Sequence, residues 1–153
     1  MSRVAVGGTF NPLHDGHIAL LKKAVELSRG GELLIGLTSD EMTMKKDHEV
    51  DDYQKRYDDV MKFVKTLGFI PKIVKLDDPY GPTIREDFDY LVVSPETHQS
   101  GLKINIIRGE RNLKQLNIVL VDYVLADDGL PISSTRIWKG EIDNHGKVLC
   151  KAN

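Results

Sequence analysis

The sequence predicts an α/β fold in which a single doubly wound parallel sheet of five strands carries helices on both faces. Two observations lead to this prediction. Short apolar runs of strand length alternate with longer segments whose apolar residues recur every three or four positions. A glycine pair follows the first strand-like run and another follows the first helical segment. In such sheets, ligands bind beyond the carboxyl ends of the strands, where the strand order reverses.

The first half of the chain is predicted to contain two strands, at residues 3–6 and 33–37, and two helices, at residues 16–29 and 51–67. Gly30-Gly31 ends the first helix, and Gly68 ends the second. The second helix is amphipathic, because its apolar residues fall on one face: Tyr53, Tyr57, Val60, Met61, Val64 and Leu67.

The second half of the chain supplies the remaining strands, at residues 71–76, 90–93 and 118–125, and a last helix at residues 133–140. Asp122 is expected at the polar end of the fifth strand. After the fourth strand, Pro95 suits the first position of a further helix, because a helix needs no hydrogen from that backbone nitrogen.

Size and composition limit the classes of protein to consider. The 153 residues suit one domain, with a core at about 3–140 and a short tail at 141–153. A net charge of −2 gives no general attraction for nucleic acid or for an anionic membrane, so neither is expected as a partner. The single cysteine, Cys150, provides no disulfide framework, and a cytoplasmic location is expected. Composition predicts no oligomeric state.

The first motif is Gly-Gly-Thr-Phe-Asn-Pro-Leu-His-Asp-Gly-His at residues 7–17. Its glycines allow close backbone approach, Thr9 adds a hydroxyl, and two histidines bracket the start of a helix. Free N–H groups at a helix start suit a phosphate, and both imidazoles can face the same anion. It is not a P-loop, because the Gly-Lys-Ser/Thr ending is missing. His14 and His17 can instead form half of a zinc site, although no Cys or His cluster elsewhere completes one.

The second motif is Ile-Ser-Ser-Thr-Arg at residues 132–136. Three hydroxyl residues open the last helix. Taken alone, Ser133 is explained as a helix N-cap. Beside the first motif, the same hydroxyls suit phosphate binding, and Arg136 adds a forked cation that can bind phosphate through two hydrogen bonds.

These two motifs resemble the His-x-Gly-His and Ile-Ser-Ser-Thr signatures of the nucleotidyltransferase superfamily. Gly-Leu-Thr-Ser-Asp-Glu at 36–41, Asp-Pro-Tyr-Gly-Pro at 78–82 and Leu-Val-Val-Ser-Pro-Glu-Thr at 91–97 are similar to one branch, the phosphopantetheine adenylyltransferases of archaea. They also resemble the matching domain of eukaryotic coenzyme A synthase. Together with Gly-Leu-Lys-Ile-Asn at 101–105, the likeness extends over nearly the whole chain.

The resemblance implies a Rossmann-like fold and transfer of AMP from ATP to 4′-phosphopantetheine, which gives dephospho-coenzyme A and pyrophosphate. The acceptor phosphate attacks in line, without a covalent intermediate. Mg²⁺ is expected to arrive with ATP, held by phosphate oxygens with few protein ligands. Dephospho-coenzyme A or coenzyme A is expected as a product or feedback ligand. Two alternatives stay open: transfer to another acceptor (FMN, nicotinamide mononucleotide or glycerol phosphate), or an inactive nucleotide or coenzyme A sensor.

The resemblance also implies roles for individual residues. The expected catalytic residues are His17, Thr9 and one of Lys45 and Lys46. The expected ATP-binding residues are Gly8, Phe10, His14, His17, Ser94, Glu96, Ser133, Ser134, Thr135 and Arg136. The expected acceptor-binding residues are Thr9, Lys45, Tyr80 and Gly81.

The chain departs from the superfamily at two basic positions. Bacterial enzymes of this activity carry Gly-x-Arg after the fourth strand, where this chain has Ser-Pro-Glu-Thr at 94–97. Arg85, Arg108 and Arg111 are the alternatives for that arginine. Many relatives also carry a basic residue where this chain has Trp138, for which Arg136 and Lys139 are both substitutes.

Overall fold

The computed structural model describes residues 1–46 and 48–149, so Cys150 lies outside the described residues. The elements of its first half are β1 (Arg3–Gly8), α1 (Asp15–Ser28), β2 (Glu32–Thr38), α2 (Asp40–Thr43) and α3 (Tyr53–Thr66). Those of its second half are β3 (Lys72–Leu76), η1 (Gly81–Ile84, a 3₁₀ turn), β4 (Tyr90–Val93), α4 (His98–Glu110), β5 (Asn117–Leu120) and α5 (Ser134–Trp138).

The five strands form one parallel sheet in the order β3-β2-β1-β4-β5. The predicted α/β fold is therefore confirmed. The chain adds β2 and β3 on one side of β1 and then β4 and β5 on the other, so the strand order reverses at β1. Val4 of β1 pairs with Leu33 of β2 on one side and with Tyr90 of β4 on the other. The carboxyl ends of β1 and β4 lie at this reversal, which is where a doubly wound sheet binds its ligands.

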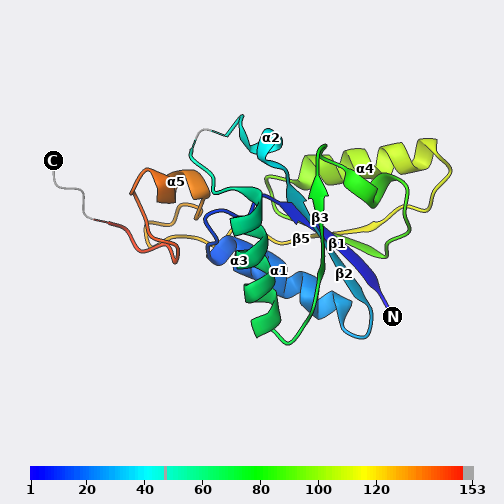
Figure 1. Ribbon diagram of the computed structural model, residues 1–153, viewed down its shortest axis with the longest axis horizontal. Helices are drawn as coiled ribbons and strands as arrows, with labels where there is room; N and C mark the ends of the chain where they lie inside the picture. The colour runs from blue at the N-terminus through cyan, green and yellow to red at the C-terminus, as the bar shows by residue number, and fades with distance from the viewer. Residues whose placement is uncertain (47, 150–153) are drawn as a thin grey trace.

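Helices cover both faces of the sheet (Figure 1). Alternate residues of β1 point to opposite faces. Val4 and Val6 belong to a core with α1 and α3, whereas Ala5 belongs to a second core with Ile104 of α4. Burial on both sides explains why the strands read as nearly continuous apolar runs.

Two predicted boundaries are wrong by three residues or more. The fifth strand ends at Leu120 rather than at residue 125. Its neighbour β4 ends at Val93, whose carbonyl accepts a last hydrogen bond from Val121, so later residues have no strand to pair with. Helix α4 starts at His98 rather than at Pro95. The preceding four residues form a turn in which the Ser94 N–H donates to Thr97 Oγ1 at 3.0 Å. The short helix α2 is an addition to the predicted elements.

The segment after β5 builds a small third core from Ala126, Ile132 and Ile142. It lies at one end of the molecule, around α5 (Figure 1). Two antiparallel bridges, Leu125 with Pro131 and Ile142 with Val148, shape it. Residues 141–149 therefore fold back onto the second motif.

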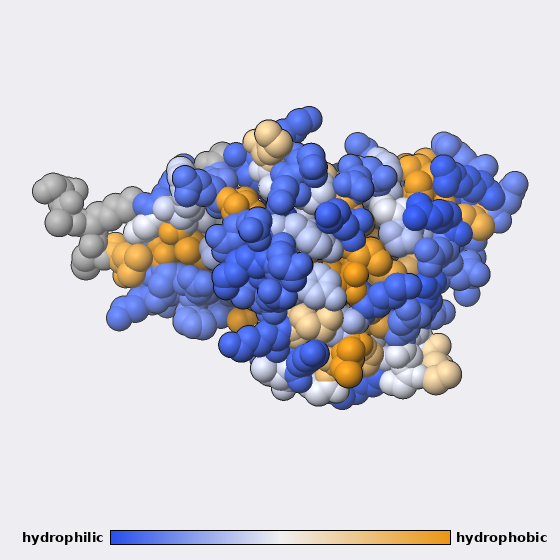
Figure 2. Space-filling view, viewed as in Figure 1, coloured by the Kyte–Doolittle hydropathy of each residue, from blue (hydrophilic) through white to orange (hydrophobic). Residues whose placement is uncertain are grey.

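The surface seen in Figure 2 is mostly hydrophilic, with hydrophobic side chains showing in separate places. Within residues 1–46 and 48–149, no helix combines the length and the apolar character that a bilayer crossing requires.

Candidate active site

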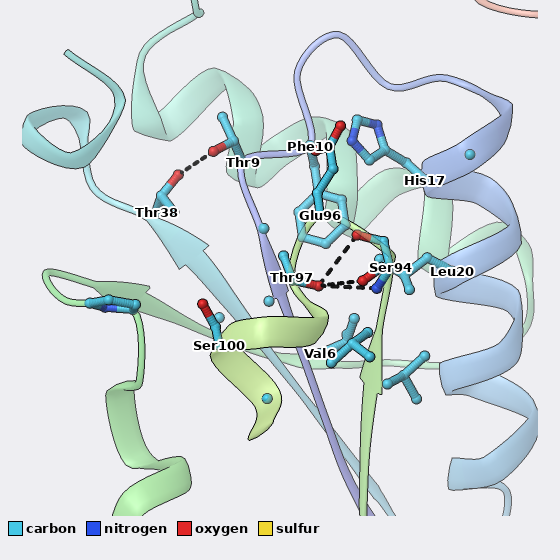
Figure 3. Close-up of a pocket in the computed structure, with 18 of the residues that line it drawn as sticks. Val6, Thr9, Phe10, His17, Leu20, Thr38, Ser94, Glu96, Thr97 and Ser100 are labelled. Atoms are coloured by element: carbon cyan, nitrogen blue, oxygen red, sulfur yellow. Dashed lines mark hydrogen bonds between the residues drawn. The ribbon is translucent and has the colours of Figure 1, made fainter. Parts of the chain in front are cut away.

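One cleft, of about 360 Å³, opens at the carboxyl ends of the strands. Both sequence motifs line it, as the sequence predicts: Gly8, Thr9, Phe10, His14 and His17 from the first, and Ser133, Ser134 and Thr135 from the second. Figure 3 shows Thr9 past the end of β1, His17 on α1 and Ser94 past β4, arranged around the same space. Segments from opposite ends of the sequence thus share one crevice.

His14 caps helix α1 with its side chain. Its Nδ1 atom accepts hydrogen bonds from the backbone N–H groups of Gly16 at 3.0 Å and of His17 at 3.4 Å. This places the proton of the neutral ring on Nε2. The imidazole is buried and locked in one tautomer, so it can act as a hydrogen-bond donor at a fixed place.

His17 is oriented in the reciprocal way. Its Nδ1 atom accepts the backbone N–H of His14 at 3.4 Å, so its Nε2 is also the protonated nitrogen. The two imidazoles stack with ring centroids 3.7 Å apart, and Phe10 meets the His17 ring edge-on at 5.3 Å. Two neutral N–H donors are therefore held side by side at the start of α1.

Burial keeps both imidazoles uncharged. Loss of contact with water lowers the pKa of His14 to about 4, although Asp15 opposes the shift. Burial also lowers the pKa of His17 to about 3, with a further lowering by His14 and a smaller one by Lys46, against an opposing backbone contact with Pro12. At neutral pH each ring is uncharged and can donate a hydrogen bond to a phosphate oxygen.

Thr9 is held by a buried arginine that the sequence reasoning missed. The Thr9 and Thr38 hydroxyls lie 2.9 Å apart (Figure 3), and Arg56 Nη1 donates to Thr38 Oγ1 at 3.2 Å. Arg56 also donates to the Asp51 carbonyl at 2.8 Å and pairs with Asp40 at 3.1 Å. This fully buried guanidinium joins the ends of β1 and β2 to the start of α3. A lone arginine on an otherwise amphipathic helix is the only sequence signal for it.

Phe10 has a backbone φ of 54°, in the left-handed region that side chains other than glycine rarely adopt. Its ring is buried, 1% exposed, and lies 3.2 Å from where a Cβ on Gly8 would stand. Burial of the ring stabilises this strained turn. A Cβ at position 8 would crowd this ring, which would have to move by a few tenths of an ångström.

The turn after β4 forms another wall of the cleft. Ser94 and Glu96, both predicted ATP-binding residues, line it together with Thr97 and Ser100. Thr97 Oγ1 lies 3.3 Å from Ser94 Oγ and 3.4 Å from the Ser94 carbonyl (Figure 3). These bonds fix the turn that presents Ser94 and Glu96.

The second motif divides between the cleft and the structure behind it. Ser133 Oγ caps α5 by accepting the Arg136 N–H at 3.2 Å, so the capping interpretation holds beside the cleft-lining one. Arg136 lies outside the cleft lining. Its guanidinium pairs with Asp128 and Glu141, the latter at 3.3 Å. Arg136 therefore supports the hydroxyl residues through these ion pairs and does not itself line the cleft.

The lysine pair is separated by the structure. Lys46 lines the cleft, whereas Lys45 does not. The Lys46 charge makes a small contribution to the lowered pKa of His17, which indicates that this charge lies near the imidazole. The Lys46 N–H donates to the Thr43 carbonyl at 3.0 Å, which ties this residue to the end of the short helix α2.

The remaining wall of the cleft is apolar and includes Leu34, Leu76, Tyr80, Pro82, Leu91 and Ile104. Tyr80 is a predicted acceptor-binding residue, but its neighbour Gly81 lies outside this lining. Asp78 Oδ1 shapes the turn by accepting the N–H groups of Tyr80 and Gly81, each at 2.8 Å. These two bonds lower the pKa of the Asp78 carboxyl.

None of the three alternative arginines lines the cleft. Arg85 donates to the Gly81 carbonyl at 3.2 Å, and Arg111 donates to the Ile84 carbonyl at 3.1 Å. Arg108 is fully buried and donates to the carbonyls of Lys114, Thr83 and Glu86. Arg108 thus joins α4 to η1, and all three arginines bond to backbone carbonyls.

Further residues that line the cleft but were not among the predicted site residues include Met42, His48, Asp122 and Tyr123. Asp122 follows β5, and its Oδ1 accepts the Tyr123 N–H at 2.7 Å. The expected place of Asp122, at the polar end of the predicted fifth strand, was a usable signal, because strand ends of this sheet meet at the cleft.

Residues 5–140 match the cytidylyltransferase-like family. The chain belongs to this family. It is 55% identical to the phosphopantetheine adenylyltransferase of Methanosarcina barkeri over 97% of this chain and 93% of that protein. The enzyme of the same name from Methanosarcina mazei is 53% identical over 99% of this chain and 100% of that protein. The resemblance to archaeal phosphopantetheine adenylyltransferases is thereby confirmed.

Among solved structures, a protein of unknown function from Archaeoglobus fulgidus is similar. It is 45% identical and superposes with a TM-score of 0.75, over 78% of this chain and 89% of that chain. A tyrosyl-tRNA synthetase from the same organism shares the fold alone, at 14% identity and a TM-score of 0.65, over 89% of this chain and 59% of that chain.

Proposed function

We propose that this chain transfers the adenylyl group of ATP to 4′-phosphopantetheine, giving dephospho-coenzyme A and pyrophosphate. One observation carries the proposal: the histidine pair and the hydroxyl run, at opposite ends of the sequence, line one cleft. A triphosphate needs donors along its whole length, and this cleft offers imidazoles from the first motif and hydroxyls from the second. Relatives with more than half of their residues identical carry the corresponding name.

The acceptor phosphate attacks the α-phosphorus in line, and pyrophosphate leaves on the opposite side. The acceptor is already an anion, so no strong general base is needed. The chain's contribution is to position two polyanions and to stabilise charge on the five-coordinate phosphorus. The Nε2–H of His17 donates to the α-phosphate oxygens, and the Lys46 ammonium neutralises charge as it builds. Thr9 orients the acceptor phosphate.

The other donors hold the nucleotide. His14 binds the nucleotide phosphates together with the backbone of Gly8 and Phe10. Ser133, Ser134 and Thr135 hold the β- and γ-phosphates, which become the leaving pyrophosphate. Ser94 and Glu96 contact the nucleotide from the turn after β4. Arg136 supports the hydroxyl run from behind through its ion pairs.

Mg²⁺ enters this proposal with ATP. Within residues 1–46 and 48–149, no group of three His, Cys, Asp or Glu side chains forms a metal cage. The cleft carboxylates, Glu96 and Asp122, fit the ordinary manner of Mg²⁺, which keeps several waters and binds substrate phosphates with one or two carboxylates. Mg²⁺ supplies charge neutralisation on the phosphates.

The apolar wall selects the acceptor. Pantetheine is a long, narrow arm of methyl, methylene and amide groups that ends in a thiol. Leu34, Leu76, Leu91 and Ile104 offer it an apolar surface beside the phosphate donors, with Tyr80 at the edge. Glycerol phosphate has no apolar part to use this wall. FMN and nicotinamide mononucleotide would bring broad flat rings to it.

Pyrophosphate release tests the proposal. The purified chain is incubated with Mg²⁺, either ATP or CTP, and each acceptor in turn: 4′-phosphopantetheine, FMN, nicotinamide mononucleotide and glycerol phosphate. We expect release with ATP and 4′-phosphopantetheine only, and dephospho-coenzyme A as the product. Release with another acceptor would favour the first alternative. Tight binding of ATP or coenzyme A without any release would favour the sensor. A cytoplasmic location stays part of the proposal.

A further inference from the structure

The segment after α5 connects the two motifs of the cleft. Its contact with the first motif is made by Asn144. The Asn144 side chain donates from Nδ2 to the Leu13 carbonyl at 2.6 Å, and the Asn144 backbone carbonyl accepts the Asp15 N–H at 3.1 Å. Leu13 and Asp15 are the two neighbours of His14. Asn144 therefore holds the backbone on both sides of the residue that caps α1.

His145 adds a third bond to the same turn. Its Nδ1 lies 2.8 Å from Asp15 Oδ1, and this carboxylate raises the pKa of the imidazole. The His145 side chain is 75% exposed and the Asp15 side chain 34% exposed. An ion pair this open contributes little to folding stability. The pair instead holds Asp15, which lies between His14 and Gly16, against the segment after α5.

The segment after α5 also packs against the residues that precede the second motif. The Gly146 carbonyl accepts the Asp127 N–H at 2.8 Å. A Cβ on Gly146 would lie 2.8 Å from both the Ala126 Cα and the Ile132 Cδ1. Ile142, 1% exposed, packs into the same small core as Ile132, the residue that precedes the hydroxyl run. The next residues after that core are those that grip the first motif.

The geometry points to Asn144 and His145 as positioning residues for adenylyl transfer, which clamp the histidine turn to the hydroxyl segment so that both ends of the triphosphate site keep a fixed separation. This inference rests on the proposed function. Neither residue lines the cleft, so both act through others. The need is physical: donors must stand within a fraction of an ångström of the transition-state oxygens, and a displacement of about 1 Å can cost ~100-fold in rate.

The test uses the full chain with three substitutions and one matched control. Asn144→Ala removes the bond to Leu13, and His145→Ala removes the bond to Asp15. His145→Asn is the conservative variant, because the asparagine Nδ2 stands near the place of the histidine Nδ1 and can still donate. Lys147→Ala is the control, because it lies in the same segment and its hydrogen bonds to Asp143 are made by its backbone. The Lys147 N–H donates to Asp143 Oδ1 at 2.9 Å, and the Lys147 carbonyl accepts the Asp143 N–H at 3.0 Å.

We expect Asn144→Ala to lower kcat by about 10-fold or more while the KM for ATP changes much less, since misplaced donors weaken transition-state binding most. His145→Ala should act in the same direction, and His145→Asn should recover most of the loss. Lys147→Ala should match the unaltered chain. The melting temperature should stay close to that of the unaltered chain in all four variants, which separates positioning from unfolding.

A second readout does not depend on the proposed reaction. The imidazole nitrogen signals of His14 and His17, measured by NMR, should move in Asn144→Ala and stay in place in Lys147→Ala. If the unaltered chain releases no pyrophosphate with any acceptor, the proposed function fails and these signals still test the clamp. Unmoved signals with kcat within two-fold of normal in Asn144→Ala and His145→Ala would overturn the inference. A kcat loss that only parallels a fall in melting temperature would also overturn it.

Discussion

The imidazole of His14 accepts the backbone N–H of Gly16 at 3.0 Å, and this bond leaves no room for a side chain at position 16. A Cβ there would lie 2.8 Å from His14 Cε1 and 3.0 Å from His14 Nδ1. The glycine between the two histidines is thus the space that the capping ring occupies. The cap in turn fixes the tautomer that makes each ring a donor at Nε2.

Gly16→Ala should therefore impair the site more than the fold. The added methyl pushes the His14 ring off its cap, and with it the stacked His17. We expect kcat to fall by about 10-fold or more, as for other misplaced catalytic groups. Gly109→Ala is the matched control, because a Cβ at this helical glycine meets nothing within 4 Å. It should leave kcat unchanged and raise stability by up to about 1 kcal/mol. Equal kcat in both variants would contradict the argument.

His17→Ala should lower kcat by at least ~100-fold with the fold intact, because it removes a preorganised donor to the α-phosphate. His17→Gln is the informative companion, since the glutamine Nε2 stands near the histidine Nε2 and can still donate. We expect it to recover part of the loss. Steady-state kinetics with a circular dichroism check of the fold measures both. Near-normal turnover in His17→Ala would remove this residue from the mechanism.

The sequence predicted the fold and the meeting of the two motifs because both follow from local rules: apolar periodicity, glycine breaks and parallel strands. It could not place Lys46 in the cleft and Lys45 outside it, since the loop between α2 and α3 has no periodic pattern that sets side-chain direction. Nor could it show Arg136 turned towards Asp128, because that ion pair depends on how residues 121–132 fold after β5 ends.

Arg56 and the contacts of Asn144 and His145 with the first motif were missed for a related reason. Their partners are backbone carbonyls, hydroxyls and single carboxylates far away in sequence, such as Thr38 for Arg56 and Leu13 for Asn144. A residue type can suggest that a partner exists, but only the packed structure says which group it meets. The parts of the site that sequence patterns predicted are those built from neighbouring residues.

Lys46→Ala should lower kcat far more than Lys45→Ala. Lys46 lines the cleft and its charge lies near His17, whereas Lys45 lies outside the lining. Loss of a cation that neutralises developing phosphate charge is expected to cost about 100-fold. The two variants remove the same charge from adjacent positions, so they share any effect of net charge. Equal losses in pyrophosphate release would contradict the assignment of Lys46.

Arg56→Ala should lower stability as well as activity. It leaves the Asp51 carbonyl without this donor, while the Thr38 hydroxyl keeps the Thr9 hydroxyl as its partner at 2.9 Å. A polar group left without its buried donor costs about 1–3 kcal/mol, and packing around the removed side chain is lost as well. We expect the free energy of unfolding, measured in urea, to fall by at least about 2 kcal/mol. Lys55→Ala on the same helix is the control, because its ion pair with Asp59 is exposed and should contribute little. Similar urea midpoints would show that Arg56 is dispensable for the fold.

The buried histidines should make stability fall in acid before most carboxylates protonate. In the unfolded chain an imidazole has a pKa near 6.5, whereas burial lowers the pKa of His17 to about 3. Between these values the unfolded state binds the proton and the folded state does not, so stability rises with pH across this window. The contribution of His17 is complete above about pH 6.5 and is lost as the pH falls towards 3. At pH 5 the loss for His17 is about 2 kcal/mol.

Urea unfolding at pH 5.0 and 7.5 tests this loss. The difference in free energy of unfolding between the two pH values should be larger in the unaltered chain than in His17→Asn, which has no imidazole to titrate at that position. Equal differences in the two proteins would show that His17 is not held neutral by the fold.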